Sequence, residues 1–381
     1  LDRRSQRRFN MPQRYLHIIS FDVPYPPDYG GVIDVFYKIR ALKEAGIQVI
    51  LHCYTYGRKP AKELEEVCMR VHYYPRRSGL RYFLGQTPYI VSTRTSKSMP
   101  VNLLRDSFPV LFEGLHSTSL LNLCAGAGKK VIVRTHNIEH QYYRLLARSE
   151  TNLFRKIFLR SESGKLLRYE SVLERADHLL CIARHETAYF NGKYHDALFI
   201  PPFHRFSEVT SLSGTGDYVL FHGNLSVPEN SAIFTRLTEK VLSRTRIPVI
   251  VAGKDPPERL RRMVGKYPNI TMIACPSEER MDDLLQNAHV NLLFTSQSTG
   301  MKLKLLHALH AGRHCLVNRQ MVEGTGLDQL CHLVDGDRNT LERLNELMDV
   351  PFTETEIRTR MKVLSEYSNR TGAEKIARLL S

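Results

Sequence analysis

The sequence lacks long apolar runs and paired cysteines. Its longest apolar stretches, such as Val290 to Phe294, extend over only a few of the 381 residues, whereas a helix that crosses a bilayer needs ~20. The seven cysteines are odd in number and never spaced C-x-x-C, and Cys181, like most of them, stands in an apolar run. These absences argue against a membrane span, a disulfide framework and a zinc site. They favour buried, reduced thiols in a soluble, cytoplasmic protein.

Acidic charge is scarce in the first half of the chain. Residues 1–200 contain 31 Lys+Arg and 18 Asp+Glu, a balance of +13, whereas the remainder carries only +2 of the total of +15. Residues 1–14 read as a basic extension with no apolar segment behind it, which argues against a secretory signal. A basic half favours an anionic partner, such as a phosphorylated substrate or a membrane surface, and a solvated basic face is the alternative. No nucleic acid is expected, because no ribbon of interleaved aromatic and basic residues is present.

Short apolar runs alternate with helix-length segments along the chain. A strand at 15–20, a loop with Gly30 and Gly31, a helix at 32–45 and a strand at 47–52 form one βαβ unit. A stretch rich in Pro, Ser and Gly follows residue 200, and the alternation then restarts. The pattern predicts an α/β fold with two Rossmann-like, doubly wound parallel-sheet domains. We expect them at 1–205 and 206–350, with C-terminal helices at 351–381 that pack back toward the N-terminal domain.

Ligands of doubly wound sheets bind beyond the carboxyl ends of the strands, so the turns there are the candidate sites. Gly30 and Gly31 open a helix, where the backbone admits a close ligand, although a turn with unusual dihedrals is an equal alternative. The chain lacks G-x-G-x-x-G, which disfavours a nicotinamide enzyme. After the strand at 131–133, His136, Asn137 and Glu139 place ionisable and polar groups at the sheet edge, a pattern more typical of function than of packing.

Two further turns belong to the second half. Gly223 and Asn224 follow a strand and offer backbone N–H groups to a phosphate or sugar. Around Lys302, uncapped amides at the start of a helix and one ammonium group form an anion site suited to a diphosphate. The residues of this fourth turn that matter are Thr299, Gly300, Met301, Lys302 and His307.

Together the four turns resemble glycosyltransferase family 4 of the GT-B architecture, in its bacterial, polysaccharide-building branch. The segments "FDVPYPPDYGGVIDVFYKIRALKEAGIQVILH", "VIVRTHNIEHQYYRLLA", "FHGNLSVPENSAI" and "TGMKLKLLHALHAGRHCLVN" are similar to four segments of that family, in the right order over roughly residues 15–335. The resemblance implies a retaining, metal-independent hexosyltransferase without cofactor. It would move a sugar from a nucleotide sugar, held in the C-terminal domain, to a lipid-linked or polysaccharide acceptor, held mainly in the N-terminal domain across a cleft.

The resemblance also assigns roles to residues. His136 would contact the sugar and Lys302 would neutralise the leaving diphosphate, which makes these two the expected catalytic residues. Asn137 and Glu139 would bind the acceptor. The donor would be bound by Gly30, Gly31, Gly223, Asn224, Thr299, Gly300, Met301, Lys302 and His307.

The sequence departs from the family at one important point. The family helix usually carries two glutamates eight positions apart, and here those positions hold Thr299 and His307. A histidine cannot bind two ribose hydroxyls as a carboxylate does. A catalytically weakened or inactive homologue that binds nucleotide or glycan is therefore the alternative function.

A membrane surface is the expected site of a lipid-linked acceptor. Basic residues near the apolar segment 82–84 would rest on anionic lipid at the inner face of the membrane. These residues are Arg76, Arg77, Arg81, Arg94 and Lys97.

Overall fold

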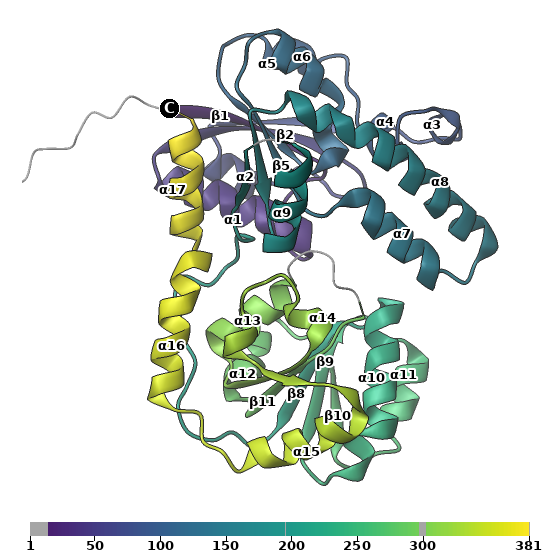
Figure 1. Cartoon of the computed structure of the whole chain (residues 1–381), viewed down its shortest axis with the longest axis vertical. Helices are drawn as coiled ribbons and strands as arrows, with labels where there is room; N and C mark the ends of the chain where they lie inside the picture. Colours follow the sequence, from purple (N-terminus) through teal and green to yellow (C-terminus); the bar gives the residue numbers. More distant parts are fainter. Residues whose placement is uncertain (1–13, 195, 297–301, 381) are drawn as a thin grey trace, which may run out of the picture. The chain divides into compact units, whose positions relative to one another are not determined.

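A computed structural model of the protein describes residues 14–194, 196–296 and 302–380 (Figure 1). These residues form two compact units, each assembled from separate stretches of the chain. Of the described residues, the first unit comprises 14–181, 190–194, 196–198 and 369–380, and the second comprises 182–189, 199–296 and 302–368. The predicted site residues Thr299, Gly300 and Met301 lie outside the described residues.

The first unit is built on a seven-stranded sheet with the order β3-β2-β1-β4-β5-β6-β7. The register is parallel, as the pairing of β1 with both β2 and β4 illustrates. In β5 all five residues are buried, which is expected where helices cover both faces of a parallel sheet. The strands are β1 (Arg14–Ser20), β2 (Ile47–Thr55), β3 (Arg70–Pro75), β4 (Val110–Glu113), β5 (Val131–Thr135), β6 (His178–Cys181) and β7 (Ala197–Phe199).

Helices connect these strands. The first of them, α1, buries Val32, Val35, Phe36 and Ile39 at helical spacing. The helices of this part of the chain are α1 (Gly30–Glu44), α2 (Lys62–Val67), α3 (Arg81–Leu84), α4 (Tyr89–Ser92), α5 (Met99–Leu103), α6 (Leu121–Gly126), α7 (Glu139–Ser149), α8 (Leu153–Tyr169) and α9 (Arg184–Lys193), with 3-10 turns η1 (Leu115–Leu120) and η2 (Glu170–Arg175).

The last helix, α17 (Asn369–Leu379), belongs to the first unit although it ends the described chain. It packs against α1 and buries Ile376 completely. Arg14 Nη1 donates to the Ala377 carbonyl at 2.9 Å, and Lys130 Nζ donates to the Leu379 carbonyl at 2.9 Å. Arg14 of β1 and Lys130, which precedes β5, thus hold the carboxyl end of this helix.

The second unit is built on a six-stranded parallel sheet with the order β10-β9-β8-β11-β12-β13. Neighbouring residues of β8 point to opposite faces, since Phe221 joins one buried apolar cluster and Leu220 joins another. Helices therefore cover both faces, as doubly wound folds require. The strands are β8 (Val219–Asn224), β9 (Val249–Lys254), β10 (Ile270–Ala274), β11 (Val290–Leu293), β12 (His314–Asn318) and β13 (His332–Val334).

The covering helices complete the second unit. They are α10 (Pro228–Lys240), α11 (Glu258–Val264), α12 (Glu278–Asn287), α13 (Leu303–Ala311), α14 (Arg319–Val322), α15 (Gly336–Met348) and α16 (Glu354–Leu364), with short turns η3 (Leu242–Arg244), η4 (Asp328–Leu330) and η5 (Ser365–Tyr367). Across the described residues, helices that combine the length and the apolar character needed to span a bilayer are absent. The prediction of two doubly wound parallel-sheet domains is confirmed.

Candidate functional site

The strand order of the first sheet reverses between β1 and β4, and ligands of doubly wound sheets bind at such a reversal. Phe21 and Asp22 follow β1 at this edge, and Gly114 follows β4. His136 follows β5, the next strand along the sheet. The two segments predicted from the sequence for this domain, Gly30 to Gly31 and His136 to Glu139, are thus attached to strands around the reversal.

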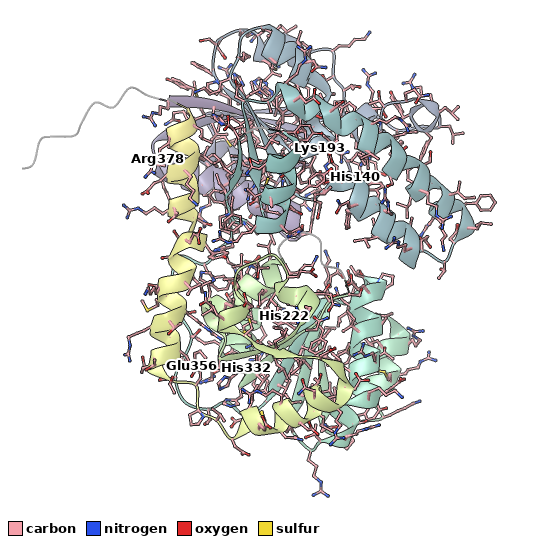
Figure 2. The ribbon with its side chains drawn as sticks, in the orientation of Figure 1. His140, Lys193, His222, His332, Glu356 and Arg378 are labelled. Carbon is pink, nitrogen blue, oxygen red and sulfur yellow. The ribbon has the colours of Figure 1, made fainter. Side chains whose placement is uncertain are left out.

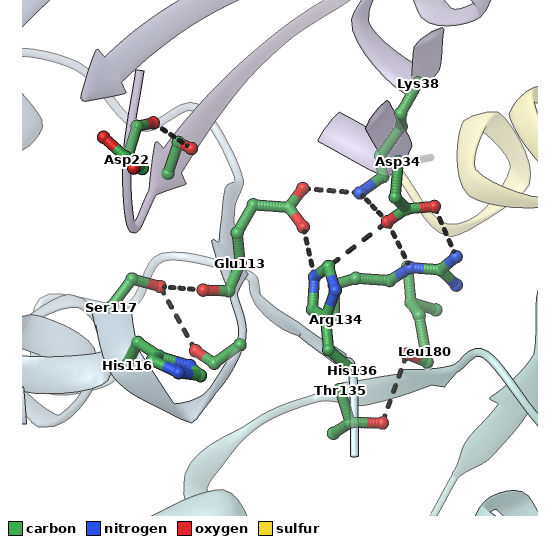
Figure 3. Close-up of polar contacts among 12 residues, drawn as sticks. Asp22, Asp34, Lys38, Glu113, His116, Ser117, Arg134, Thr135, His136 and Leu180 are labelled. Carbon is green, nitrogen blue, oxygen red and sulfur yellow. Dashed lines mark hydrogen bonds and ion pairs between the residues drawn. The ribbon is translucent and has the colours of Figure 1, made fainter. Parts of the chain in front are cut away.

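Buried charged groups lie beside His136 (Figure 3). Lys38 Nζ donates to Asp34 Oδ2 at 3.0 Å and to Glu113 Oε1 at 2.6 Å. The Arg134 guanidinium donates to both oxygens of Asp34, with Nε–Oδ2 at 3.1 Å and Nη2–Oδ1 at 2.9 Å. His136 Nε2–H donates to Glu113 Oε2 at 3.1 Å. The Glu113 carboxylate thus engages Nε2 of His136 and fixes the orientation of the imidazole ring.

The two carboxylates of this network are ionised. Burial alone raises the pKa of Asp34, but the cations of Arg134 and Lys38 outweigh burial and hold this pKa well below its usual value. Burial also opposes ionisation of Glu113, and Lys38 and His136 lower its pKa below the usual value. Both carboxylates are engaged by cations, so neither is positioned as a free nucleophile.

Two groups of side chains in the described chain bring three possible metal ligands within 4.8 Å of one another. In the first, Asp34, Glu113 and His136, the carboxylate oxygens already bind Lys38 and Arg134. A divalent cation there would meet two fixed positive charges, so this donor set fits an ion-paired network better than a metal centre.

The second such group is His314, His332 and Glu356 of the second unit. Figure 2 labels His332 and Glu356. His314 Nε2 donates to the Val350 carbonyl at 2.9 Å, and Arg343 Nη2 lies 3.0 Å from His332 Nδ1. The histidine nitrogens are therefore satisfied by protein groups, with an arginine beside them. Independence from metal stays a prediction.

Phe21 links the two predicted segments of the first unit. Its ring centroid lies 5.4 Å from that of His116 and 5.5 Å, edge to face, from that of His136. A Cβ added at Gly31 would lie 2.6 Å from Phe21 Cζ. Glycine at position 31 therefore allows the start of α1 to approach the ring closely, whereas Gly30 is exposed.

Glu139 is buried, and its carboxyl group lies near the half-buried ring of His116. Glu139 Oε1 and His116 Nδ1 are 3.9 Å apart, and neither atom has a hydrogen-bond partner among the described residues. Burial raises the pKa of Glu139 to about 8, which a hydrogen bond from Asn137 only partly opposes. Burial lowers the pKa of His116 well below its usual value. At neutral pH the pair is an uncharged carboxyl and an uncharged imidazole, which suits contact with a neutral hydroxyl.

In the second sheet the strand order reverses between β8 and β11. Glu229 stands in the first turn of α10, which follows β8, and its Oε1 accepts three hydrogen bonds from the end of β11. These come from Thr295 Oγ1 at 2.8 Å, Ser296 N at 2.7 Å and Ser296 Oγ at 2.8 Å. The carboxylate thereby ties together the two strand ends that border the reversal.

Two lysines stand beside this carboxylate at the start of α13. Lys302 is the N-cap residue of the helix, and Lys304 Nζ donates to the Phe294 carbonyl at 2.8 Å. Burial lowers the pKa of both, to about 8 for Lys304, and Glu229 opposes this only in part. Burial disfavours the charged form of both side chains. An anion bound here would stabilise that charged form.

Two neutral histidines lie in the same unit. His307 packs edge to face on Phe206, with ring centroids 5.1 Å apart, and its Nε2 has no partner within the described chain. The same holds for Nε2 of His222, on β8. Burial lowers the pKa of His307 well below its usual value and that of His222 to about 3. Position 307 therefore offers a neutral hydrogen-bonding nitrogen.

Gly223 and Asn224 shape the turn after β8. Gly223 pairs with Gly253 of β9, and a Cβ added at Gly253 would lie 1.8 Å from the Gly223 carbonyl oxygen. Asn224 is exposed, and its Oδ1 accepts from Ser226 N at 3.0 Å and Ser226 Oγ at 2.7 Å. The structure thus places both residues at the reversal, and their contact with a donor stays a prediction.

One residue proposed for membrane contact is wrongly assigned. Arg94 is only 7% exposed, and its guanidinium donates to the carbonyls of Phe21, at 2.8 Å, and Ile90, at 2.7 Å. It therefore supports the loop after β1 and cannot rest on a lipid surface.

Sequence reasoning missed several groups that build the edge of the first sheet, namely Phe21, Asp34, Lys38, Glu113 and His116. Two signals were present. Asp34 and Lys38 stand four residues apart on the apolar face of α1, and Glu113 ends the apolar run Val110–Phe112. A charge in either place is seldom buried without a partner.

The comparisons with known proteins agree with this architecture. No protein-family model matches the chain. It is 26% identical over 329 residues to the "uncharacterized 44.6 kDa protein in cps region" of Klebsiella pneumoniae, which covers 81% of this chain and 84% of that protein.

Among solved structures, sucrose-phosphate synthase from Thermosynechococcus elongatus is similar with a TM-score of 0.64, 13% identity and coverage of 96% of this chain and 98% of that one. A trehalose-phosphate synthase (UDP-forming) from Burkholderia xenovorans, in complex with glucose-6-phosphate, is similar with a TM-score of 0.64 and 12% identity. The match covers 97% of this chain and 100% of that one. UGT89C1 of Arabidopsis thaliana, complexed with UDP, is similar with a TM-score of 0.61 and 14% identity. The match covers 97% of this chain and 100% of that one. The two parallel-sheet domains are those of the GT-B glycosyltransferase fold.

Proposed function

We propose that this protein is a retaining glycosyltransferase that resembles family 4 and transfers a sugar from a nucleotide sugar to a lipid-linked or polysaccharide acceptor. Proteins of the same fold are named for sugar-phosphate synthesis or are complexed with UDP. The similar protein of Klebsiella pneumoniae is named for its cps region, which fits polysaccharide synthesis.

The observation that carries the proposal is the pair of lysines at the reversal of the second sheet. Lys302 and Lys304 lie at the start of α13, and burial lowers the pKa of both although neighbouring carboxylates oppose this. A departing nucleoside diphosphate would bring further negative charge to these two ammonium groups. Cations fixed where charge develops on the leaving group lower the barrier without reorganisation.

The first unit would hold the acceptor and the transferred sugar. His136 would contact the sugar through Nδ1, because its Nε2 is engaged by Glu113. The carboxylates beside it are ion-paired, and Glu139 is protonated at neutral pH. This environment supports transfer governed by positioning and electrostatics, with no carboxylate acting as a covalent nucleophile.

Nucleotide binding tests the proposal directly. A thermal-shift screen of nucleoside diphosphates and their sugars should identify one base that raises the melting temperature, because ligand binding stabilises the folded state. Lys302→Ala should weaken binding about ten- to a hundredfold, since it removes a charge-assisted contact. Lys240→Ala, which removes an exposed ammonium of α10, is the matched control. Equal nucleotide affinity in wild type and Lys302→Ala would remove the basis of the proposal.

A non-catalytic homologue is the second candidate, because His307 stands where the resemblance predicts a glutamate. Such a protein would bind the same nucleotide without consuming the sugar donor. His307→Glu should then restore turnover, measured as release of nucleoside diphosphate in the presence of acceptor.

A further inference from the structure

Two neighbouring helices of the first unit expose large apolar side chains. Leu80 and Leu84, at the two ends of the short helix α3, are 80% and 87% exposed, and Leu153, Phe154 and Ile157 of α8 are 66%, 83% and 57% exposed. These five residues are called the α3–α8 surface below. Burial in α8 begins only at residue 162, so the first two turns of this helix contribute little to the core of the domain.

The helices α3, α4 and α8 belong to the same part of the first unit (Figure 1). Contacts between their residues hold the α3–α8 surface together. The centroid of the Phe83 ring lies 5.2 Å from that of Phe158 of α8 and 4.2 Å from that of Tyr89 of α4. Lys165 Nζ donates to the Phe83 carbonyl at 2.6 Å, and Tyr89 N donates to Glu162 Oε2 at 2.6 Å. These contacts therefore fix the exposed leucines and phenylalanine relative to one another.

The charge around this surface is mostly positive, with Glu150 as an acidic residue just before α8. The sequence contains no acidic residue between Glu66 and Asp106, and between Glu150 and Glu170 it contains only Glu162, which is buried. Arg81, Arg155 and Arg160 are exposed.

The helix dipole does not account for the positive charge at the start of α8. Arg155 stands in the first turn of α8, which has no acidic residue, although the helix dipole disfavours positive charge at this end. Basic residues therefore outnumber acidic ones in the segments that form this surface, which fits an anionic partner.

We propose that the α3–α8 surface docks the protein on an anionic phospholipid membrane, with the apolar side chains in the headgroup–acyl boundary and the arginines on lipid phosphates. Apolar side chains flanked by cations are typical of interfacial membrane segments. A nucleic acid would leave Leu84 and Ile157 without a role, and a second copy of this surface would oppose like charges. The inference rests on the proposed function and deepens it, because a membrane-docked enzyme would take a lipid-linked acceptor.

Co-sedimentation with vesicles tests the docking surface, and it suits a chain without tryptophan. The protein should bind vesicles of phosphatidylcholine with phosphatidylglycerol, and added salt should weaken binding. Phe154→Ser with Ile157→Ser should lower the partition coefficient at least tenfold. Arg155→Ala with Arg160→Ala should lower it about fivefold per cation removed. Leu333→Ser with Val350→Ser, at side chains 46% and 47% exposed in the second unit, is the matched control.

Several outcomes would overturn the docking surface. These are equal binding to pure phosphatidylcholine, unchanged binding of the Phe154→Ser, Ile157→Ser protein, and conversion of a dimer to a monomer by that variant in analytical ultracentrifugation. Circular dichroism verifies folding of each variant, and nucleotide binding is measured on the same samples. Loss of vesicle binding with intact nucleotide binding separates this inference from the donor site, and wild-type nucleotide binding without vesicle binding overturns the inference alone.

Discussion

Carboxyl groups near His136 differ in protonation although they lie at one edge of the same sheet. Glu113 is held ionised by Lys38 and His136, which together outweigh burial. Glu139 is also buried, but burial outweighs the hydrogen bond from Asn137 and the charge of Arg94, and it raises the pKa of Glu139 from the ordinary value of 4.5 to about 8. At the residue scale the partner, not the depth of burial, decides which form of a carboxyl the fold stabilises.

The raised pKa of Glu139 predicts a pH-dependent stability. The folded state binds the proton more tightly than the unfolded state, so the stabilisation is fully present below about pH 4.5 and is lost as the pH rises through about 8. Wild type should lose a few kcal/mol of unfolding free energy from this group, at about 1.4 kcal/mol for each unit of pKa difference. Urea unfolding from pH 5 to 9 measures the change.

Glu139→Gln is the matched variant, because an amide resembles the protonated carboxyl and cannot ionise. Its difference in stability from wild type should grow in favour of the variant as the pH rises. Parallel pH profiles for the two proteins would show that Glu139 does not titrate in this window.

The start of α1 is shaped by the element it meets. Gly31 stands where a methyl group would collide with Phe21, whose ring is packed against His116 and His136. The sequence suggested two alternatives for this glycine, an unusual turn or a close ligand. The contact with Phe21 adds a structural reason at position 31, and the role of Gly30 with a ligand stays a prediction.

Gly31→Ala should therefore be destabilising, although glycine to alanine within a helix ordinarily stabilises by about 0.5–1 kcal/mol. Overpacking against Phe21 should cost about 1–3 kcal/mol and move the ring away from His136. Chemical denaturation gives the stability.

Gly126→Ala serves as the control, since a Cβ there meets nothing within 4 Å. The prediction requires the two alanines to act with opposite sign. Equal effects at positions 31 and 126 would contradict it.

At the scale of the whole molecule, the chain leaves the first unit, builds the second and returns. Its last helix, α17, is buried against α1, more than 300 residues earlier in the sequence. The first unit therefore depends on the carboxyl end of the chain for its core.

Ile376→Ala should lower the stability of the first unit by about 2–5 kcal/mol, because it empties a fully buried position on α17. The unfolding transition of the first unit should shift while nucleotide binding to the second unit is kept. Met361→Ala on α16, at a side chain 54% exposed, should leave both unchanged. A shift only in the unfolding transition of the second unit would contradict the packing of α17 in the first unit.

The sequence by itself determined the fold class, because the alternation of short apolar runs and helix-length segments depends only on local periodicity. It also identified His136 and Lys302 as groups that follow strands, since position after a strand is a local property. Only the tertiary structure decided what surrounds them: Glu113 comes from β4, Phe21 from the loop after β1 and Glu229 from the helix after β8. Likewise, nothing local in residues 369–379 specifies α1 as their partner. Contacts between residues far apart in sequence arise from packing of the whole sheet, and packing sets the burial and charge partners on which their chemistry depends.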